Sequence, residues 1–267
     1  MARLTVSPDY SYDMRQFNLT TLLFGDSYYR STRMFVAHVG DDAVVFNGTG
    51  FKYDHDGYPT AGWVTSIGQF VSGELAATTD GLHASAVGML DAALTYSLSD
   101  DHRIQSRALG GNDVIKGANG DDVLLGFGGN DKISGKDGAD SIDGGAGNDT
   151  ITGGRGEDSL RGGAGADHFV YSHLSDGSST FDIIYGFSVH QHDKIDLSQF
   201  DANVEHSGHD DAHYIGRSSF RGHAGELRYQ HVAGHTYVEI DTDGDKGIDF
   251  IIRIYDNVSL HKGDFIV

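Results

Sequence analysis

Seven aspartates recur at every ninth residue in the middle of the chain: Asp113, Asp122, Asp131, Asp140, Asp149, Asp158 and Asp167. A glycine stands two residues before each aspartate and an apolar residue stands two residues after it. Carboxylates that a repeat brings close together repel one another unless a cation lies between them. Ca²⁺ suits such a gap, because it takes about 6–8 oxygen ligands at about 2.3–2.6 Å from carboxylates and backbone carbonyls.

The elements that must position these aspartates follow from the nine-residue period of residues 108–170, which hold 18 of the 38 glycines. The last three positions of each nine predict a short strand with one apolar side chain turned inward. The first six predict a turn, in which glycines permit positive φ and close backbone approach. Two nines complete one coil, so each turn stacks on the turn two repeats later, with strands about 4.8 Å apart.

This stacking predicts the number of cation sites. The first, third, fifth and seventh turns share one edge and enclose three gaps, while the other turns enclose two, so five Ca²⁺ ions are expected. A flexible linker rich in Gly and Asp is the alternative, but it would not keep Asp and an apolar residue in fixed columns. Mg²⁺ demands a tighter octahedron, and softer metals prefer His or Cys.

The G-G-x-G-x-D-x-U-x pattern of residues 108–170 resembles the RTX (hemolysin-type) calcium-binding repeat. The resemblance implies a right-handed parallel β-roll of seven nonapeptide repeats. It also implies that each ion takes two Asp carboxylates, carbonyls from positions two and four of one turn, and carbonyls from positions one and three of the turn stacked on it. Leu109, Phe127 and Lys136 depart from the pattern, since each replaces a second glycine. The implied carbonyl ligands are Leu109, Gly111, Ala118, Gly120, Gly126, Phe127, Gly128, Gly129, Gly135, Lys136, Asp137, Gly138, Gly144, Gly145, Ala146, Gly147, Gly153, Arg155, Gly162 and Ala164, followed by Gly154, Gly156, Gly163 and Gly165 in the last turns.

Residues 171–267 lose the period and alternate apolar with polar positions, as strands do. They resemble the serralysin-type C-terminal region, through D-K-I-D-L-S at residues 193–198, A-G-E-L-R-Y at residues 224–229 and D-F-I-V at residues 264–267. That resemblance implies a β-sandwich cap on the roll and an uncleaved signal for type I secretion. The last coil needs carboxylate partners, for which Asp176, Asp182 and Asp193 are the candidates by position.

A second calcium candidate is the run D-T-D-G-D-K-G-I-D, which carries Asp241, Asp243, Asp245 and Asp249. Carboxylates at alternate positions before a turn resemble the start of an EF-hand loop, but Ile252 stands where that loop needs a bidentate Glu. The alternative is a solvated β-hairpin turn.

Histidines gather in the C-terminal part of the chain. His190 and His192 would share a face of a strand, and His206, His209 and His213 would share a face of a helix. Such sets can bind zinc or copper. Gly208 weakens a helix there, so surface histidines in a polar loop are the favoured interpretation.

Residues 1–107 differ in composition and predict a separate small α+β domain. We expect helices over 10–24 and 82–95, and strands over 34–39, 43–54 and 62–70. Residues 48–67 resemble a domain often found before RTX repeats in bacterial exported proteins, which implies no function.

Catalytic motifs do not stand out in the N-terminal region. The sequence has no HExxH, GxSxG or Walker motif, which favours a non-enzymatic role without excluding an unrecognised enzyme. Spacing singles out no set among His38, His55, His83, Asp41, Asp42, Asp54 and Asp56. Trp63 with Tyr53 and Tyr58 predicts either a sugar-binding platform or a buried aromatic cluster.

Composition excludes several functions. A formal net charge of −20 argues against nucleic acid and anionic membrane surfaces as partners. The absence of Cys excludes a disulfide scaffold and thiolate zinc sites. No apolar run reaches about 18 residues, so stable membrane insertion is not expected. The start of the chain lacks the pattern of a secretory signal peptide, which agrees with type I export.

These observations predict a calcium-binding repeat protein, secreted by a Gram-negative bacterium, whose roll folds on binding Ca²⁺ outside the cell. The expected partners are calcium ions and the type I secretion machinery, with a cell-surface glycan as a candidate. Three classes stay open: a structural or adhesive module, an N-terminal carbohydrate-binding or enzymatic domain exported by the repeats, and a pore-forming toxin. The toxin class is the weakest, because no membrane-active segment precedes the repeats. The predicted domains are residues 1–107, the roll over 108–170, and the cap over 171–267.

Overall fold

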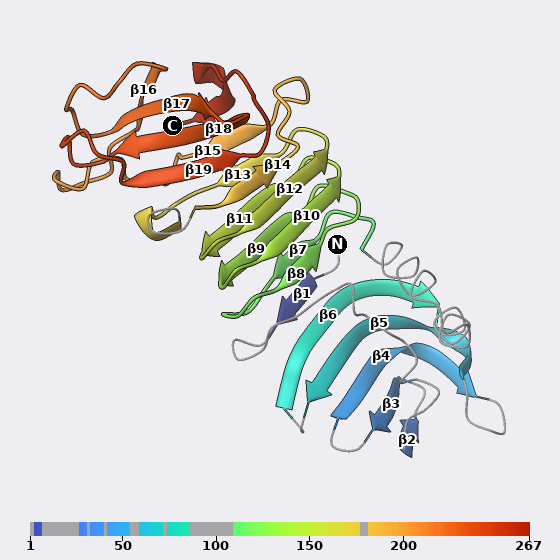
Figure 1. Cartoon of the computed structure of the whole chain (residues 1–267). Helices are drawn as coiled ribbons and strands as arrows, with labels where there is room; N and C mark the ends of the chain where they lie inside the picture. The colour runs from blue at the N-terminus through green and yellow to red at the C-terminus, as the bar shows by residue number, and fades with distance from the viewer. Residues whose placement is uncertain are drawn as a thin grey trace.

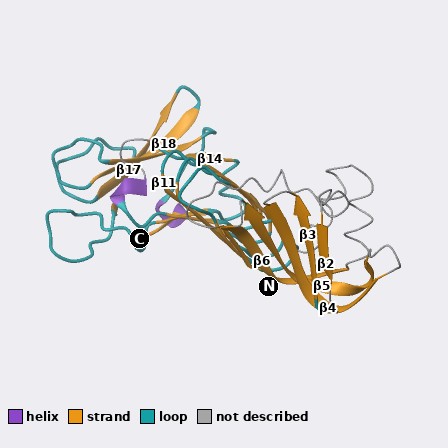
Figure 2. Ribbon diagram, turned by 90° about the horizontal axis from the view of Figure 1, so that it is seen from below, coloured by secondary structure: helices purple, strands orange, loops and turns teal. Residues whose placement is uncertain are grey.

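The structure is a computed structural model that describes residues 3–6, 27–30, 33–39, 42–53, 59–71, 74–85, 109–176 and 181–267. Nearly all regular structure in these residues is strand, arranged in two sheets (Figure 1). The only helical turns described are the 3-10 turns η2 (Leu174–Asp176) and η3 (Lys262–Asp264), both in the C-terminal part (Figure 2). Within the described ranges, no helix is long and apolar enough to cross a membrane.

The N-terminal strands form an antiparallel meander, β2-β3-β4-β5-β6. Its strands are β2 (Ser27–Arg30), β3 (Met34–Val39), β4 (Asp42–Tyr53), β5 (Pro59–Val71) and β6 (Glu74–Ser85). The three strands predicted here are confirmed as β3, β4 and β5.

The two predicted N-terminal helices fare differently. The helix expected over 10–24 lies outside the described residues. The helix expected over 82–95 is wrong at its start, because residues 82–85 continue β6 and Ser85 pairs with Trp63 of β5. The rest of that segment lies outside the described residues. Apolar residues at helical spacing did not decide the structure here, because a long cross-strand partner was available.

The repeats build the middle of the molecule as short parallel strands. Sheet A holds β7 (Val114–Lys116), β9 (Lys132–Asp137), β11 (Thr150–Arg155) and β13 (His168–Val170). Sheet B holds β8 (Val123–Leu125), β10 (Ser141–Ala146) and β12 (Ser159–Ala164). Paired residues differ by 18 in number, as in Ile133↔Ile151 and Ile142↔Leu160. The inward apolar side chains of both sheets are buried and belong to one core.

The C-terminal region extends both sheets of the roll. In sheet B, β14 (Ile183–Tyr185) follows β12 and leads to β19 (Phe250–Ile254), β18 (His235–Asp241), β17 (Glu226–Val232) and β16 (His213–Gly216). In sheet A, β15 (Lys194–Asp196) follows β13 and pairs with β20 (Phe265–Ile266). The cap is therefore continuous with the roll, and Phe187 packs on Phe169 at a ring-centroid distance of 6.0 Å.

One further strand, β1 (Arg3–Val6), connects the two parts of sheet A. It pairs antiparallel with β6 on one side and parallel with β7 on the other. Sheet A thereby runs without a break from the N-terminal meander through the roll to the last strand of the chain.

Candidate metal centre

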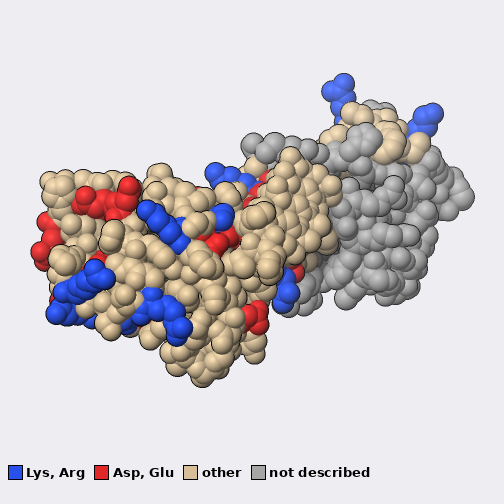
Figure 3. Space-filling view, turned by 90° about the horizontal axis from the view of Figure 1, so that it is seen from above, with Lys and Arg blue, Asp and Glu red and all other residues tan. Residues whose placement is uncertain are grey.

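The seven repeat aspartates end their turns just before a strand, and all of them are buried, with exposures between 0 and 3%. The charge is therefore hidden inside the roll. On the face shown in Figure 3, acidic side chains are few and interspersed with basic ones over the described surface. A buried carboxylate costs several kcal/mol unless it is paired, hydrogen-bonded or bound to a metal.

These aspartates form two ladders through hydrogen bonds from coil to coil. In the first, the backbone N–H of Asp113 donates to Oδ1 of Asp131, and the pattern repeats through Asp149 and Asp167, at 2.8–2.9 Å. In the second, the N–H of Asp122 donates to Oδ1 of Asp140, and that of Asp140 donates to Oδ1 of Asp158, both at 2.8 Å. One oxygen of each accepting carboxylate is thus fixed in place.

The other oxygen, Oδ2, has no hydrogen-bond partner in six ladder aspartates of the described chain, although it is buried. An orphaned buried acceptor of this kind is rare and calls for an explanation. Five of the six oxygens belong to the same position of successive repeats, so an accident of local packing does not account for them. A cation held against Oδ2 does. The six residues are Asp131, Asp140, Asp149, Asp158, Asp167 and Asp182.

Backbone carbonyls surround the same positions. A Cβ added to Gly135 would lie under 3.0 Å from both Oδ2 of Asp140 and the carbonyl oxygen of Gly153. The same clash, with a carboxylate Oδ2 and a carbonyl of the next coil, recurs at Gly126 and Gly144. The first glycine of the repeat is therefore required to leave room for a group of oxygens. Carboxylate and carbonyl oxygens are the ligands that Ca²⁺ prefers.

The second and fourth positions need left-handed backbone. Gly145 has φ of 101° and Gly147 has φ of 129°. Phe127 and Lys136 adopt the same conformation, with φ of 66° and 90°, although they carry side chains. The left-handed turn geometry is thus kept at Phe127 and Lys136, two of the second positions where the sequence departs from glycine, at a cost of about 1 kcal/mol each.

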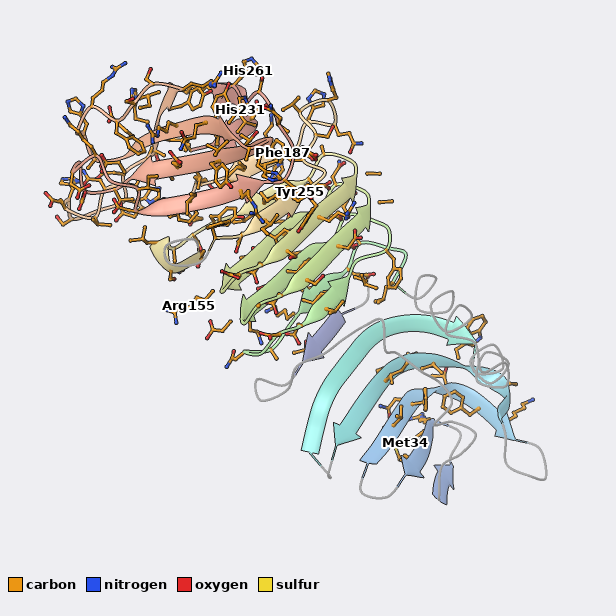
Figure 4. All side chains as sticks on the ribbon, in the orientation of Figure 1. Met34, Arg155, Phe187, His231, Tyr255 and His261 are labelled. Carbon is orange, nitrogen blue, oxygen red and sulfur yellow. The ribbon has the colours of Figure 1, made fainter. Side chains whose placement is uncertain are left out.

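Third-position carbonyls also meet the stacked turn. Those of Ala146, Arg155 and Ala164 accept hydrogen bonds from fourth-position N–H groups of the neighbouring coil at 2.7–2.9 Å. A carbonyl has two lone pairs, so these oxygens keep one for a metal. The side chain of Arg155 projects away from the roll (Figure 4).

The electrostatics of the ladders follow from burial. Burial raises the pKa of Asp131 and Asp140 to about 7, and the charges of neighbouring ladder aspartates raise it against the lowering effect of the backbone hydrogen bond. Burial also raises the pKa of Asp158 and Asp167 to about 6; the nearby charges that add to it are those of Asp176 and Asp121 for Asp158, and that of Asp193 first for Asp167. Without a counter-charge, the ladders cannot stay fully ionised near neutral pH.

Two of the three candidates for the last coil join the ladders. Asp158 donates its N–H to Oδ1 of Asp182 at 3.0 Å, and Asp167 donates to Oδ1 of Asp193 at 3.1 Å. Burial, followed by the charge of Asp158, raises the pKa of Asp182 to about 8. Asp176 does not continue a ladder: its Oδ2 accepts from the N–H groups of Ser172 and His173 in its own turn.

The first coils differ from the rest. Leu109 is buried in the apolar core, with 3% exposed. The N–H of Ala118 donates to Oδ2 of Asp122 at 2.6 Å. A Cβ on Gly111 would meet no atom within 4 Å, because no turn is stacked on its outer side in the described chain. The first turn is therefore less enclosed at Gly111 than the later turns are at their fourth positions.

Sequence reasoning missed a second set of side-chain ladders beside the first. Oδ1 of Asn112 accepts from the N–H of Asn130, Oδ1 of Asn130 from that of Asn148, and Oδ1 of Asn148 from that of Ala166, all at 2.8 Å. These bonds run in the direction opposite to the aspartate ladder. The signal was present, since asparagine occupies the fifth position of three alternate repeats.

The acidic hairpin turn brings three of its four candidates together. Ligand atoms of Asp241, Asp243 and Asp249 all lie within 4.8 Å of one another. Asp245 is not in this group, and its Oδ1 accepts from the N–H of Gly247 at 2.5 Å. Both oxygens of Asp241 accept from the turn, at Gly244 and Lys246. The turn is thus stabilised by its own hydrogen bonds.

The histidines do not assemble a metal site within the described ranges, where no group of ligand side chains includes one. His206 lies 2.8 Å from Oδ2 of Asp210, and His209 lies 3.6 Å from Asp211. In the N-terminal sheet, Trp63 is 48% exposed, while the side chains of Tyr53 and Tyr58 lie outside the described part of the chain.

Stacked parallel coils with buried aspartates and glycine-walled oxygen clusters define an RTX-type β-roll. The family model described as "Peptidase M10 serralysin C terminal" matches residues 108–267, and the chain belongs to this family. The fold and its family confirm the RTX-type roll and the serralysin-like C-terminal region predicted from the sequence.

Two solved structures are similar to part of the chain. Both are solution structures from the mannuronan C5-epimerase of Azotobacter vinelandii. The AlgE6R2 subunit is 29% identical, with a TM-score of 0.43, over 57% of this chain and 90% of its own length. The AlgE6R3 subunit is 27% identical, with a TM-score of 0.22, over 58% of this chain and 78% of its own. No curated protein matches the chain.

Proposed function

We propose that this chain is an exported calcium-binding protein whose β-roll folds when Ca²⁺ ions bind between stacked aspartates. Membership of an RTX-type family implies calcium binding in general terms. The observation that carries the specific assignment is the set of six buried Oδ2 atoms without a partner. Each belongs to a ladder carboxylate. The Oδ2 atoms of Asp131, Asp140 and Asp149 lie beside a first-position glycine that also faces a carbonyl oxygen of the next coil.

The ladders define where the ions would bind. Five gaps lie between repeat aspartates, as the sequence predicts. Asp182 and Asp193 add one gap at the C-terminal end of each ladder. When bound, Ca²⁺ supplies the positive charge that lets neighbouring carboxylates stay ionised. The chain's own part is to hold Oδ1 by a backbone N–H and to leave Oδ2 and the carbonyls facing the gap.

Calcium-dependent folding would allow the chain to be exported unfolded and to fold outside the cell. Extracellular calcium modules typically have Kd of about 10⁻⁴–10⁻³ M. A roll of that affinity stays open at the low free calcium of a cytoplasm, and binding energy becomes folding energy outside. The type I route, the extracellular location and the division into regions 1–107, 108–170 and 171–267 are parts of this proposal. They rest on the serralysin-like region that follows the roll.

A matched pair of variants tests the proposal. Asp158→Asn keeps an oxygen to accept the N–H of Asp140 but removes a buried charge next to two gaps. We expect two fewer calcium ions by isothermal titration calorimetry and a roughly tenfold higher calcium midpoint of the far-ultraviolet circular dichroism signal. In excess chelator the variant should show more residual strand signal than the natural chain, because one buried charge is gone.

The control is Glu157→Gln, which removes a charge from the exposed neighbouring residue. It should change stability by less than about 0.5 kcal/mol in either condition. Equal effects of the two substitutions on calcium stoichiometry would contradict the assignment, as would strand signal that is already complete in chelator.

A further inference from the structure

The N-terminal strand β1 occupies an unusual place. Residues Arg3–Val6 lie between β6 of the N-terminal sheet and β7 of the roll (Figure 1). The pairing with β6 covers four residues and that with β7 covers three. Thr5, at the centre, pairs with Thr78 on one side and Lys116 on the other. In the described chain, β1 is the only strand through which the two parts of sheet A are hydrogen-bonded.

Strand β7 belongs to the first coil of the roll. It has three residues, whereas β9 beside it has six. Its turn has a stacked turn on one side alone, since a Cβ on Gly111 would meet nothing within 4 Å. Apart from β1, the contacts that hold β7 in sheet A come from β9.

The position of β7 is set at the first gap of the aspartate ladder. Asp113 directly precedes β7 and donates its N–H to Oδ1 of Asp131, while its carbonyl accepts from the N–H of Lys132 at 2.9 Å. Any cation between these two carboxylates therefore holds the strand that β1 needs as a partner. Without it, two buried like charges act against the same coil.

We propose that β1 couples calcium binding in the roll to the order of the N-terminal sheet. Calcium in the gap between Asp113 and Asp131 closes the first coil, the closed coil offers β7 as a partner to β1, and β1 in turn completes the edge of β6. The coupling is reciprocal, so pairing of β1 raises the calcium affinity of this gap. The inference rests on the proposed function, because it requires calcium in the ladder.

The test uses the full chain and two signals measured in one calcium titration. Far-ultraviolet circular dichroism reports the roll, and hydrogen exchange of residues 74–85 reports strand β6. Trp63, the single tryptophan, lies on β5 beside β6 and gives a fluorescence signal for the same region. We expect protection of residues 74–85 to increase with calcium in the natural chain.

Two variants at opposite ends of one ladder separate the gaps. Asp113→Asn affects the first gap alone, and we expect the calcium midpoint for protection of residues 74–85 to rise about fivefold or more. Asp193→Asn affects the last gap alone and should leave that midpoint at its natural value. A second pair acts on β1 itself: Thr5→Pro removes a backbone donor from the strand, and Thr5→Val preserves it. Thr5→Pro should make protection of residues 74–85 independent of calcium, and Thr5→Val should not.

The outcomes distinguish the two levels of the proposal. If calcium leaves the circular dichroism signal unchanged, the proposed function fails. If the roll responds but protection of residues 74–85 does not, or if Asp113→Asn and Asp193→Asn shift it equally, the coupling through β1 is overturned while the calcium-binding roll stands.

Discussion

At the scale of single residues, one repeat position carries two demands at once. Each ladder aspartate must lie within hydrogen-bond reach of the coil next to it, and it must leave one oxygen facing a gap. Asp140 meets both, with Oδ1 bound to the N–H of Asp122 and Oδ2 beside Gly135. The first glycine is as necessary as the aspartate, because any side chain there would displace the carboxylate.

Backbone conformation at the second repeat position gives a prediction for stability. Lys136 has φ of 90°, and its register partner Gly154 has φ of 117°. Lys136→Gly should stabilise the calcium-bound chain by about 0.5–1 kcal/mol, because relief of left-handed strain exceeds the added unfolded-state entropy. Urea denaturation in saturating calcium measures this.

The reverse substitution serves as the comparison. Gly154→Ala adds a Cβ under 3.0 Å from the carbonyl of Lys136 and should destabilise the chain by more than about 2 kcal/mol. The explanation is wrong if both substitutions shift the urea midpoint in the same direction.

At the scale of elements, the strands are too short to be stable alone, and the coil-to-coil bonds hold them. Apolar residues such as Ile133 and Leu160 fill the interior, while two side-chain ladders of opposite direction link the turns at the edges. The aspartate ladder stabilises the roll only when the negative charges of its carboxylates are compensated. The stability of the roll should therefore depend on pH in a way that calcium reverses.

The sign of this dependence follows from the raised pKa values. The pKa of Asp131 and Asp140 is raised to about 7 and that of Asp182 to about 8, from the ordinary 3.8, with burial as the largest cause. Between the unfolded-state pKa of 3.8 and the folded-state values of about 7 to 8, the folded chain without metal holds more protons than the unfolded chain. Its stability therefore falls as pH rises from about 4 to about 8.

Calcium displaces these protons, so the calcium-bound chain should instead lose stability, and calcium affinity, as pH falls through the same range. The far-ultraviolet circular dichroism signal in chelator and thermal unfolding in calcium, each at several pH values, measure the two slopes. Slopes of the same sign in the two conditions would contradict the account.

The sequence predicts most of the roll because its period is local and exact in register. Asp and an apolar residue in fixed columns predict the coil, the stacking of each turn on the turn two repeats later, and the inward side chains. The observed strand pairing, between residues 18 positions apart, agrees with this. The part of Asp182 and Asp193 in the ladders could be predicted only from their position just after the roll, because they lie outside the repeats. The insertion of β1 between β6 and β7 could not be predicted, since it joins residues more than 70 positions apart through backbone pairing.

At the scale of the whole molecule, sheet A connects every part of the chain. It begins in the N-terminal meander, continues through the roll, and ends at β20 near the last residue. A change in the strand pairing of the roll can therefore affect both the N-terminal meander and the C-terminal strands through this sheet. Calcium, in this view, is a structural component of the fold rather than an addition to a finished surface.

The most direct test is a crystal structure of the full chain grown in millimolar calcium, with anomalous diffraction to locate the ions. The account predicts anomalous peaks between successive members of each aspartate ladder, in contact with Oδ2 of Asp131, Asp140, Asp149, Asp158 and Asp167. Empty gaps with these oxygens still unpartnered, or peaks on exposed carboxylates alone, would contradict it.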